Sequence, residues 1–329
     1  MSNNKKIFII AEIGNNHEGN YVVAKKMIKA AKLCNVDAVK LQYIHPDKFF
    51  HKSLSNSIKK YNKFYLNERK IKKLKIYADR LGIKLFTTFF DLNNLKKLKN
   101  NFNFFKIASS DNNYKELIKE TIKSKKKTFI SLGLLKQLEI NRLVTYLKNN
   151  DRNVHKYVSL MHCVSSYPAK DNEVNLKKII YLKRKFPKFK IGYSDHTIGN
   201  EACYVAASLG AEVIEKHFTL SKKFSSFRDH HLSADPYEMG VLVKSIRKIE
   251  TMLSSNKNSF NNQKKNIKNF RRSIFINRDI KKGEKVNKKD LLYLRPVIGI
   301  KLENVNSILG KKIKINLKKN SPVKNKFFE

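Results

Sequence analysis

Two histidines and one carboxylate in this sequence lie at or near the ends of apolar runs, where an ionisable side chain is unexpected. His196 ends KIGYSDH, His217 ends EVIEKH, and Glu12 follows four apolar residues in FIIAEIG. Two imidazoles on successive strands can bind one divalent ion and leave positions open for water or substrate oxygen. We therefore predict a metal site at His196 and His217, with a local hydrogen bond for each histidine as the alternative. Glu12 is a candidate general acid or base, or else the partner of a nearby lysine.

A second set of residues has the chemistry to bind an anion. Lys40 lies in AVKLQ and Lys106 in FFKIASS, and a lysine inside an apolar strand is costly to bury without a partner. Serine hydroxyls near the ends of other strands would add directional hydrogen bonds to these point charges. The sequence has no P-loop and no GxGxxG motif, which argues against a nucleotide, and Cys163 is expected to pack rather than to react. The predicted phosphate-binding set is Lys40, Lys106, Ser109, Ser131, Ser165 and Ser194.

The spacing of the apolar runs indicates how these residues are positioned. Eight short runs rich in β-branched and aromatic residues alternate with lysine-rich amphipathic stretches such as 21–33, 67–81 and 175–185. This alternation predicts a parallel α/β fold, and eight units in about 250 residues match a (β/α)8 (TIM) barrel, whose active site lies at the carboxyl ends of the strands. Each run ends in polar residues, as the eighth does in Lys216 and His217, so the chemistry is expected there. The predicted strands are residues 7–14, 38–42, 84–90, 104–110, 128–133, 158–166, 190–196 and 213–218.

The amino-acid composition of the sequence changes after Met252. Residues 254–269 are mainly Ser, Asn and Lys with Phe260 and Ile267 as apolar anchors, which indicates a linker. A compact β-rich unit with glycines at its turns is expected from Phe270 onward. The predicted organisation is a barrel domain in 1–253, a linker in 254–269 and a small second domain in 270–329.

Composition limits the cellular setting and the class of partner. No run approaches the ~18 apolar residues of a membrane helix, and Cys34, Cys163 and Cys203 form no CxxC pair. These features predict a cytoplasmic protein with no disulfide framework and no membrane association. The net charge of +43 would suit a basic nucleic-acid-binding barrel without catalysis, the alternative from another functional class. Because lysine is scattered through every segment, we expect no specific nucleic acid as a partner.

Six motifs occur in an order that resembles a known enzyme family. They are IIAEIGNNHEG, AVKLQ, FFKIASSD, HCVSSYPA, GYSDHTIG and GAEVIEKHFTL. Together they resemble the N-acetylneuraminate (sialic acid) synthase family, and the tail from FRRSIFINRDIKKGEKV to ILGKKIKINL resembles the antifreeze-like (SAF, β-clip) domain of those enzymes. The resemblance implies condensation of phosphoenolpyruvate with an N-acetylated mannose-type sugar, such as N-acetylmannosamine. The products would be a nine-carbon 2-keto (nonulosonic) acid and phosphate.

The same resemblance implies roles for individual positions. A divalent ion, Mn²⁺ foremost with Mg²⁺ or Co²⁺ as alternatives, would bind His196 and His217, and Glu12 would act at the condensing carbons. Phosphoenolpyruvate would bind the lysines and serines named above, with Ser165 where the family often has asparagine. The protein would form a domain-swapped homodimer in which one tail completes the sugar pocket of the other subunit. The implied sugar contacts are Gln42, Thr88, Tyr167, Asp229 and, from the partner's tail, Arg295.

Four departures from the family pattern fall where the sugar is chosen. SSFRDH replaces PGPDH, FTTFF lacks the proline usual after the threonine, SLG replaces STG, and RPVIG replaces an RPG-type turn. The metal and phosphate motifs keep the pattern. The reaction type is therefore fixed more firmly than the sugar, and a legionaminic-type diacetamido-trideoxy sugar is an alternative substrate, with a pseudaminic-type sugar ranked below it.

Overall fold

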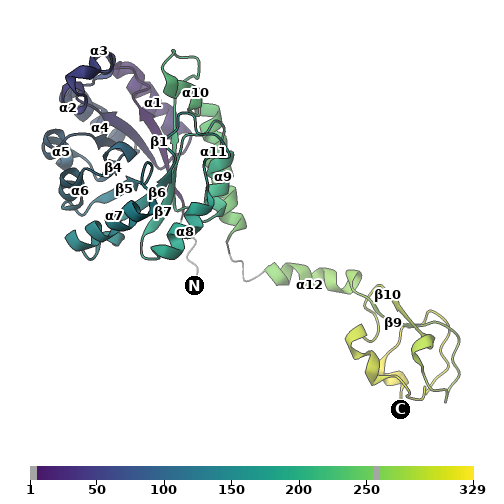
Figure 1. Cartoon of the computed structure of the whole chain (residues 1–329). Helices are drawn as coiled ribbons and strands as arrows, with labels where there is room; N and C mark the ends of the chain where they lie inside the picture. The colour runs from purple at the N-terminus through teal and green to yellow at the C-terminus, as the bar shows by residue number, and fades with distance from the viewer. Residues whose placement is uncertain (1–5, 255–258) are drawn as a thin grey trace. The chain divides into compact units, whose positions relative to one another are not determined.

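The chain folds into two compact units. The computed structural model describes residues 6–254 and 259–329, and the units are Met1–Ser254 and Ser255–Glu329. Figure 1 shows strands enclosed by helices in the first unit and the short strands β9 and β10 in the second. Each unit has its own cluster of buried apolar side chains.

The first unit is a closed barrel of eight parallel strands in the order β1 to β8. The barrel closes where β8 pairs with β1, from Phe8 opposite Val213 to Glu12 opposite His217. This arrangement confirms the predicted (β/α)8 fold. The strands are β1 (Phe8–Gly14), β2 (Ala38–Tyr43), β3 (Lys84–Phe89), β4 (Phe104–Ile107), β5 (Lys127–Ser131), β6 (Val158–Cys163), β7 (Lys190–Asp195) and β8 (Val213–His217).

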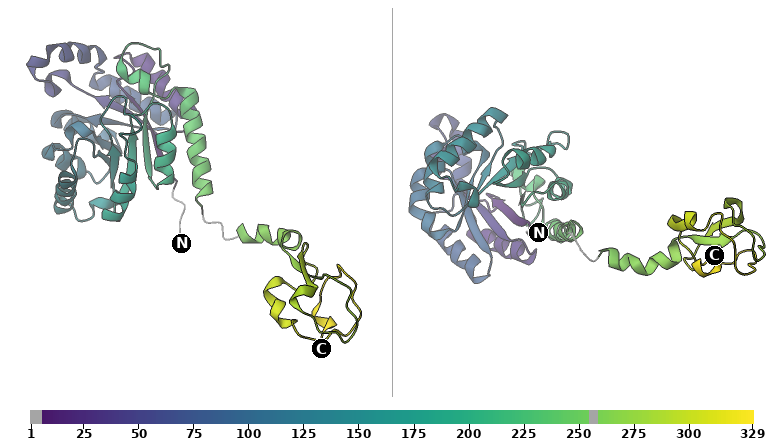
Figure 2. Two further views of the ribbon diagram at one scale, coloured as in Figure 1. Left: turned by 45° about the vertical axis from the view of Figure 1, so that its right-hand side comes forward. Right: turned by 90° about the horizontal axis from the view of Figure 1, so that it is seen from below.

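The helices of the first unit lie outside the strands (Figures 1 and 2). Helix α1 begins after Asn20, whose side chain accepts hydrogen bonds from the N–H groups of Val22 and Val23. Helix α11 begins with Pro236 after an Asp235–Glu238 capping box. The helices are α1 (Tyr21–Leu33), α2 (Pro46–Phe49), α3 (Ser55–Phe64), α4 (Glu68–Arg80), α5 (Leu92–Leu98), α6 (Lys115–Ile122), α7 (Gln137–Asn150), α8 (Lys177–Lys185), α9 (Glu201–Ser208), α10 (Arg228–Leu232) and α11 (Pro236–Met252).

Strands β4 and β6 each end three residues earlier than the apolar pattern predicts. Strand β4 ends at Ile107 and is followed by a 3-10 turn over Ser109–Asp111, and β6 ends at Cys163. Serine and aspartate side chains bond to nearby backbone groups and so favour turns over continued strand. Ser109 and Ser165 therefore lie on loops above the barrel, where their hydroxyls have more freedom to meet a ligand than on a strand.

The second unit contains helix α12 (Ser259–Phe270) and an antiparallel pair, β9 (Ser273–Ile276) with β10 (Leu291–Leu294). The predicted linker is thus largely helical. Phe260 and Ile267, read as isolated anchors, are seven residues apart, and that spacing is two helical turns. Ile274, Ile276, Ile313 and Val323 are buried at the centre of this unit, which has a core of its own despite its small size.

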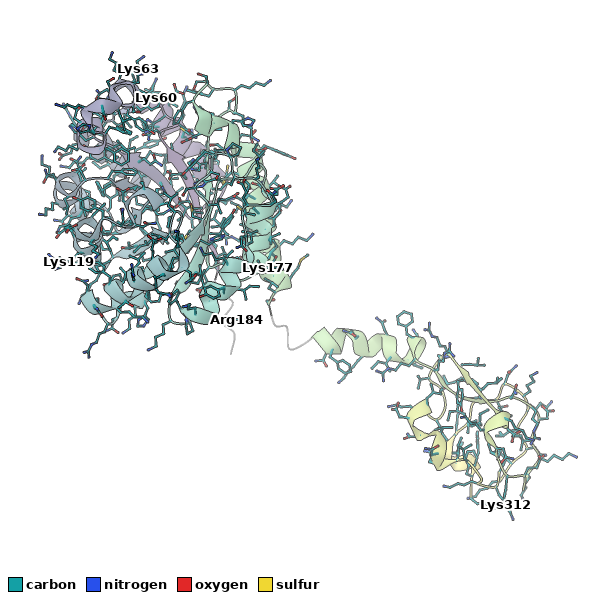
Figure 3. All side chains as sticks on the ribbon, viewed as in Figure 1. Lys60, Lys63, Lys119, Lys177, Arg184 and Lys312 are labelled. Atoms are coloured by element: carbon teal, nitrogen blue, oxygen red, sulfur yellow. The ribbon has the colours of Figure 1, made fainter. Side chains whose placement is uncertain are left out.

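Basic side chains are spread over many elements rather than gathered on one. The labelled examples in Figure 3 come from α3 (Lys60 and Lys63), α6 (Lys119), α8 (Lys177 and Arg184) and the second unit (Lys312). This distribution agrees with a compositional origin of the positive charge. Within the part of the chain that the structure describes, no helix is both long and apolar enough to cross a membrane.

Candidate active site

Four buried charged side chains meet at the carboxyl end of the barrel. Glu215 on β8 accepts hydrogen bonds from Lys106 Nζ at 2.8 Å and from Ser194 Oγ at 3.1 Å. Lys40 Nζ lies 3.6 Å from the same carboxylate and 2.7 Å from Oε2 of Glu12. The four charged residues come from β1, β2, β4 and β8 and are all buried. The barrel therefore assembles a lysine–carboxylate cluster from residues far apart in the sequence.

The two carboxylates of this cluster have opposite pKa shifts. Burial raises the pKa of Glu12 to about 7, although Lys40 partly offsets this effect, and the negative charge of Glu215 adds to it. Burial also opposes ionisation of Glu215, but Lys106 and Lys40 outweigh it and hold the pKa of Glu215 to about 2. Near neutral pH, Glu215 is thus a fixed anion whereas Glu12 exchanges a proton. With Glu12 protonated, two lysines face one carboxylate, and the excess positive charge favours an anionic ligand.

Two residues predicted to contact the sugar lie against this cluster. Gln42 Nε2 donates to Glu12 Oε1 at 3.1 Å, and Asn15 Nδ2 donates to Gln42 Oε1 at 2.9 Å. Lys40 Nζ donates to Thr88 Oγ1 at 3.2 Å. These bonds fix the orientation of the Glu12 carboxylate and the Lys40 ammonium, so Gln42 and Thr88 have a positioning effect even before a sugar is bound.

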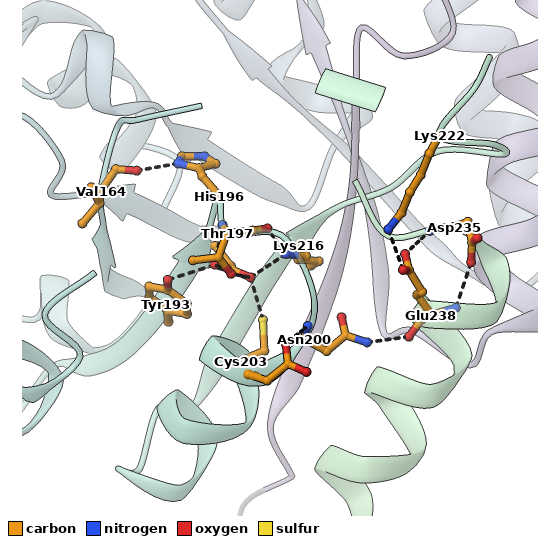
Figure 4. Close-up of polar contacts among 12 residues, drawn as sticks. Val164, Tyr193, His196, Thr197, Asn200, Cys203, Lys216, Lys222, Asp235 and Glu238 are labelled. Atoms are coloured by element: carbon orange, nitrogen blue, oxygen red, sulfur yellow. Dashed lines mark hydrogen bonds and ion pairs between the residues drawn. The ribbon is translucent and has the colours of Figure 1, made fainter. Parts of the chain in front are cut away.

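The two histidines predicted as metal ligands are neighbours at the ends of β7 and β8. Their ring centroids are 5.3 Å apart, and Tyr167 stacks on His196 at 4.2 Å. His196 Nδ1 lies 2.6 Å from the carbonyl oxygen of Val164 (Figure 4). A ring nitrogen that donates to a carbonyl leaves the other nitrogen, Nε2, with the lone pair that a metal ligand needs.

His217 also has the properties of a ligand. Its Nδ1 is buried with no hydrogen-bond partner among the described residues. Burial, followed by the charges of His196 and Lys40, keeps the pKa of His217 well below its ordinary value, so the ring is neutral. The described residues include no gathered set of three or more His, Cys, Asp and Glu side chains. The fit is thus to an ion with two protein nitrogens and its other positions left to water or substrate.

The loops after β4, β5 and β6 form a cradle of hydroxyl groups. A Cβ placed on Gly133 would lie 2.5 Å from both Ser109 Oγ and Ser165 Oγ, so only glycine allows these loops to approach so closely. Ser165 Oγ is buried with no hydrogen-bond partner in the described structure. Ser131 ends β5 and is also buried. An unpaired hydroxyl beside a bare backbone is a suitable binding place for phosphate oxygens.

Cys163 packs in this region rather than forming a nucleophile–base pair. Its sulfur accepts from Ser109 Oγ at 3.6 Å and lies 3.9 Å from His196 Nδ1. That nitrogen is already bound to the Val164 carbonyl oxygen at 2.6 Å. The imidazole nitrogen nearest the thiol is therefore already engaged and does not act as its base.

A cavity of about 600 Å³ opens beside the histidines. Its lining includes the polar side chains of Tyr167, His217 and Asp229, and Asp229 is buried on helix α10. It also includes a group of aromatic rings, with Phe49 4.9 Å from Phe90 and 4.8 Å from Phe50. The cavity thus combines polar groups with apolar rings, as a sugar-sized substrate requires.

The structure places Lys216 of β8 on the opposite side of the barrel wall from the one predicted, and it adds Glu215, which the sequence analysis did not recognise. The prediction that Lys216 reaches the mouth with His217 is wrong, because Lys216 points to the outer side of the barrel and binds Asp195 there. Glu215, which was not assigned a role, points inward to the two lysines. The signal was available in the strict alternation of a strand, in which Glu215 and His217 share one face and Lys216 takes the other. Arg295, also predicted for the site, belongs to the second unit and is exposed there.

The outward ion pair holds the ends of β7 and β8 in register. Lys216 Nζ lies 2.7 Å from Asp195 Oδ2 and donates to the Thr197 carbonyl oxygen at 2.6 Å (Figure 4). Tyr193 Oη, at 2.9 Å, and Cys203 Sγ, at 3.3 Å, also donate to Asp195. Asp195 precedes His196 and Lys216 precedes His217. The Asp195–Lys216 ion pair, on the outer side of the barrel wall, therefore sets the separation of the two imidazoles.

The geometry and the topology define a TIM-barrel enzyme with its active site at the carboxyl ends of the strands. The chain belongs to the NeuB family: residues 27–258 match the NeuB family model, and residues 271–329 match the SAF domain. It is accordingly an enzyme of the synthase type, and the alternative of a non-catalytic nucleic-acid-binding barrel is set aside.

Several curated and solved relatives resemble this chain over most of its length. The N,N'-diacetyllegionaminic acid synthase of Legionella pneumophila is 34% identical over 94% of this chain and 91% of its own. The pseudaminic acid synthase of Campylobacter jejuni is 32% identical over 97% and 95%. The N-acetylneuraminic acid (sialic acid) synthetase of Leptospira borgpetersenii, solved with citrate, has a TM-score of 0.73 and 31% identity over 80% of this chain and 94% of that one.

Loss of one partner of the Asp195–Lys216 pair is expected to destabilise the protein strongly. Lys216→Met should lower the free energy of unfolding by about 3–5 kcal/mol, because Asp195 stays buried without its counter-charge. Urea unfolding at pH 7 measures this. The double variant Asp195→Asn/Lys216→Met should recover much of the loss.

The half-exposed pair Lys222–Glu238, with Nζ and Oε1 2.5 Å apart, is the matched control. Lys222→Met should cost at most about 1 kcal/mol. An equal loss of unfolding free energy in Lys216→Met and Lys222→Met would show that burial does not increase the contribution of the Asp195–Lys216 pair to stability.

Proposed function

We propose that the protein condenses phosphoenolpyruvate with an N-acetylated mannose-type sugar and water to give a nonulosonic acid and phosphate. The observation that carries this proposal is the buried cluster of Glu12, Lys40, Lys106 and Glu215, which lies at the same end of the barrel as His196 and His217. A carbon–carbon bond would form between C3 of phosphoenolpyruvate and the aldehyde carbon of the open-chain sugar. Water oxygen would then bond to C2, and the bond from C2 to the phosphate oxygen would break to release phosphate.

The lysines and serines would bind phosphoenolpyruvate. Lys40 and Lys106 present ammonium groups that Glu215 already holds in place, so little reorganisation accompanies binding. The hydroxyls of Ser109 and Ser165 at Gly133 would donate to phosphate oxygens. Ser131 and Ser194, at the ends of β5 and β7, are the remaining members of the proposed phosphoenolpyruvate site.

Glu12 would move the proton in the second half of the reaction. Its pKa of about 7 allows the carboxylate to take a proton from the water that attacks C2 and to release it afterwards. The hydrogen bond from Gln42 Nε2 holds Oε1, and this leaves Oε2 with Lys40 on the side of the bound anion.

His196 and His217 would hold a divalent ion, Mn²⁺ foremost with Mg²⁺ or Co²⁺ as alternatives. When bound, such an ion polarises the sugar aldehyde toward attack by carbon. The protein's own contribution is to keep both rings buried and close, with His196 oriented by the Val164 carbonyl oxygen. Tyr167 covers the rings and would limit access of water to them.

The sugar would occupy the cavity beside the histidines, with Gln42, Thr88, Tyr167 and Asp229 as its polar contacts. N-acetylmannosamine is the first candidate. A diacetamido-trideoxy mannose sugar is the second, and it is favoured by the legionaminic acid synthase relative, whose similarity covers both units. The aromatic wall formed by Phe49, Phe50 and Phe90 suits a deoxygenated carbon better than a charged substituent.

Product analysis tests the proposed reaction. Protein supplied with Mn²⁺ and phosphoenolpyruvate is incubated with N-acetylmannosamine or 2,4-diacetamido-trideoxymannose, and phosphate and the acid product are followed by colorimetry and mass spectrometry. His217→Ala should lose most activity while its circular dichroism is unchanged. Full turnover by chelator-treated protein would refute the metal, and no product from either sugar would refute the substrate class.

The rate is expected to depend on the ionisation of Glu12. If the carboxylate accepts the proton from water, kcat/KM rises with pH through about 7 and levels above it, because the protonated acid cannot act as a base. Glu12→Gln should lower kcat by about 10²–10⁴-fold and remove this limb. Profiles from pH 5.5 to 8.5 measure the effect.

The matched control is Glu212→Gln, which removes a carboxylate at the opposite end of β8. This variant should keep the wild-type profile. An acidic limb that persists in Glu12→Gln would assign the titration to another group.

We also propose that the second unit completes the sugar pocket of a partner subunit in a domain-swapped homodimer. Arg295 lies on this unit, exposed directly after β10. A guanidinium offers fixed planar donors suited to the acetamido oxygen of the sugar.

Mixing two inactive variants tests the swap. Arg295→Ala and His217→Ala homodimers should each be nearly inactive. In a swapped heterodimer one site carries both changes and the other carries neither, so activity should reappear on mixing. If native mass spectrometry shows heterodimers but activity stays at the parental level, each tail serves its own chain and the swap is wrong.

A further inference from the structure

Three lysines converge at the amino-terminal end of the barrel, opposite the active site. Lys84, Lys127 and Lys190 are the first residues of β3, β5 and β7. Each is an even number of residues before a side chain assigned to the barrel interior, as Lys127 is before Phe129 and Lys190 before Ser194. Since alternate residues of a strand share a face, all three lysines begin on the inner side of the barrel wall.

Aromatic rings separate these lysines from the active site. Phe8 and Phe129 stack with centroids 5.8 Å apart, and Phe8 stacks on Phe104 at 5.6 Å. Phe86 packs beside them, 5.7 Å from Phe129. The rings fill the barrel between its two ends, so a ligand at the lysines has no route to the mouth.

A cavity of about 340 Å³ lies on this aromatic floor. Lys127, Lys156 and Lys190 line it, together with Phe8, Tyr157 and the hydroxyl-bearing Ser159. The ammonium of Lys127 lies 5.8 Å from the centroid of the Phe104 ring. The cavity therefore combines cations, one hydroxyl and partly exposed rings, which are the elements of a site for a compact organic or inorganic anion.

One carboxylate, that of Glu212, lines this cavity beside four lysines, so the charges there are only partly balanced. Among the described residues, Lys84, Lys127, Lys156 and Lys190 take part in none of the ion pairs, whereas nearby Lys6 is paired with Asp37 at 2.8 Å. Burial and then the positive charges of Lys190 and Lys84 lower the pKa of Lys127. The cavity thus keeps a net positive charge even with Glu212 beside its lysines.

We propose that this end of the barrel is a second anion site that binds a small ligand with a phosphate or diphosphate group. The ammonium groups of Lys127, Lys156 and Lys190 would bind its oxygens, with Ser159 as a directional donor. The ring floor would support a flat organic part of the ligand if one is present. The alternative is a solvated patch in a lysine-rich chain. Another hollow, of about 400 Å³ and lined by Lys119, Lys123 and Lys125, represents that alternative because it has no aromatic floor.

Binding of two probes to the full chain tests the proposal. Pyrophosphate and adenosine diphosphate are titrated calorimetrically in about 150 mM salt, where weak contacts to scattered surface charges are largely screened. The variant Lys127→Gln/Lys156→Gln/Lys190→Gln should bind at least about tenfold more weakly at one site. The control variant Lys119→Gln/Lys123→Gln/Lys125→Gln removes the same charge and should bind as wild type does.

Two further measurements separate this site from the active site. Lys106→Met removes a cation from the mouth and should leave the second site intact. The triple variant at Lys127, Lys156 and Lys190 should keep the wild-type kcat. Tighter binding of adenosine diphosphate would identify a nucleotide-like ligand, and equal binding of both probes would identify the phosphate group alone. Wild-type affinity in the triple variant, or an equal loss in the control variant, would overturn the proposal.

Discussion

The carboxylate of Glu215 is the group on which the active site depends. Two lysines buried within one barrel mouth repel each other, and each would lose its proton or expose itself to water without a counter-charge. Glu215 lies 2.8 Å from Lys106 and 3.6 Å from Lys40, so a single anion keeps both ammonium groups charged. The same arrangement leaves Glu12 as the second, weaker acid of the cluster. Around one fixed anion, the cluster thus keeps two ammonium groups and a second carboxylate whose pKa is about 7.

The scaffold and the chemistry share the same two strands. On their inner side, β7 and β8 carry Ser194, Glu215 and His217, and on their outer side they carry Asp195 and Lys216. The outer ion pair between Asp195 and Lys216 holds the two strands together, and this sets the positions of the inner side chains. A barrel of parallel strands allows this division, because its wall has one face toward ligand and the other toward the covering helices.

The sequence was sufficient for the fold and for many of the side chains that the barrel brings together at its carboxyl end, for identifiable reasons. Apolar runs at regular intervals predict the eight strands, and lysines inside such runs mark Lys40 and Lys106, because only a buried partner makes them tolerable. The partner itself, Glu215, could not be recognised without knowing which strands meet across the barrel. The apolar residues before Ser109 and Ser165 predict that the strands continue through these two serines. The turn preference of serine itself is the weaker signal in the sequence, but it decides the structure. The helical character of 259–270 was hidden by its polar composition, although the seven-residue spacing of Phe260 and Ile267 was visible.

Strand β8 carries a constraint on how this protein can evolve. Glu215, Lys216 and His217 are consecutive, and their sides of the barrel wall are decided only by whether their position in the strand is odd or even. Substitutions in this segment alter one side at a time. Insertion or deletion of a single residue inside the strand would instead exchange its two faces. The ammonium group of Lys216 would then face the barrel interior, and the carboxylate and imidazole would face the helices. A change in loop length outside β8 leaves this alternation intact, whereas a change in the length of the strand itself does not.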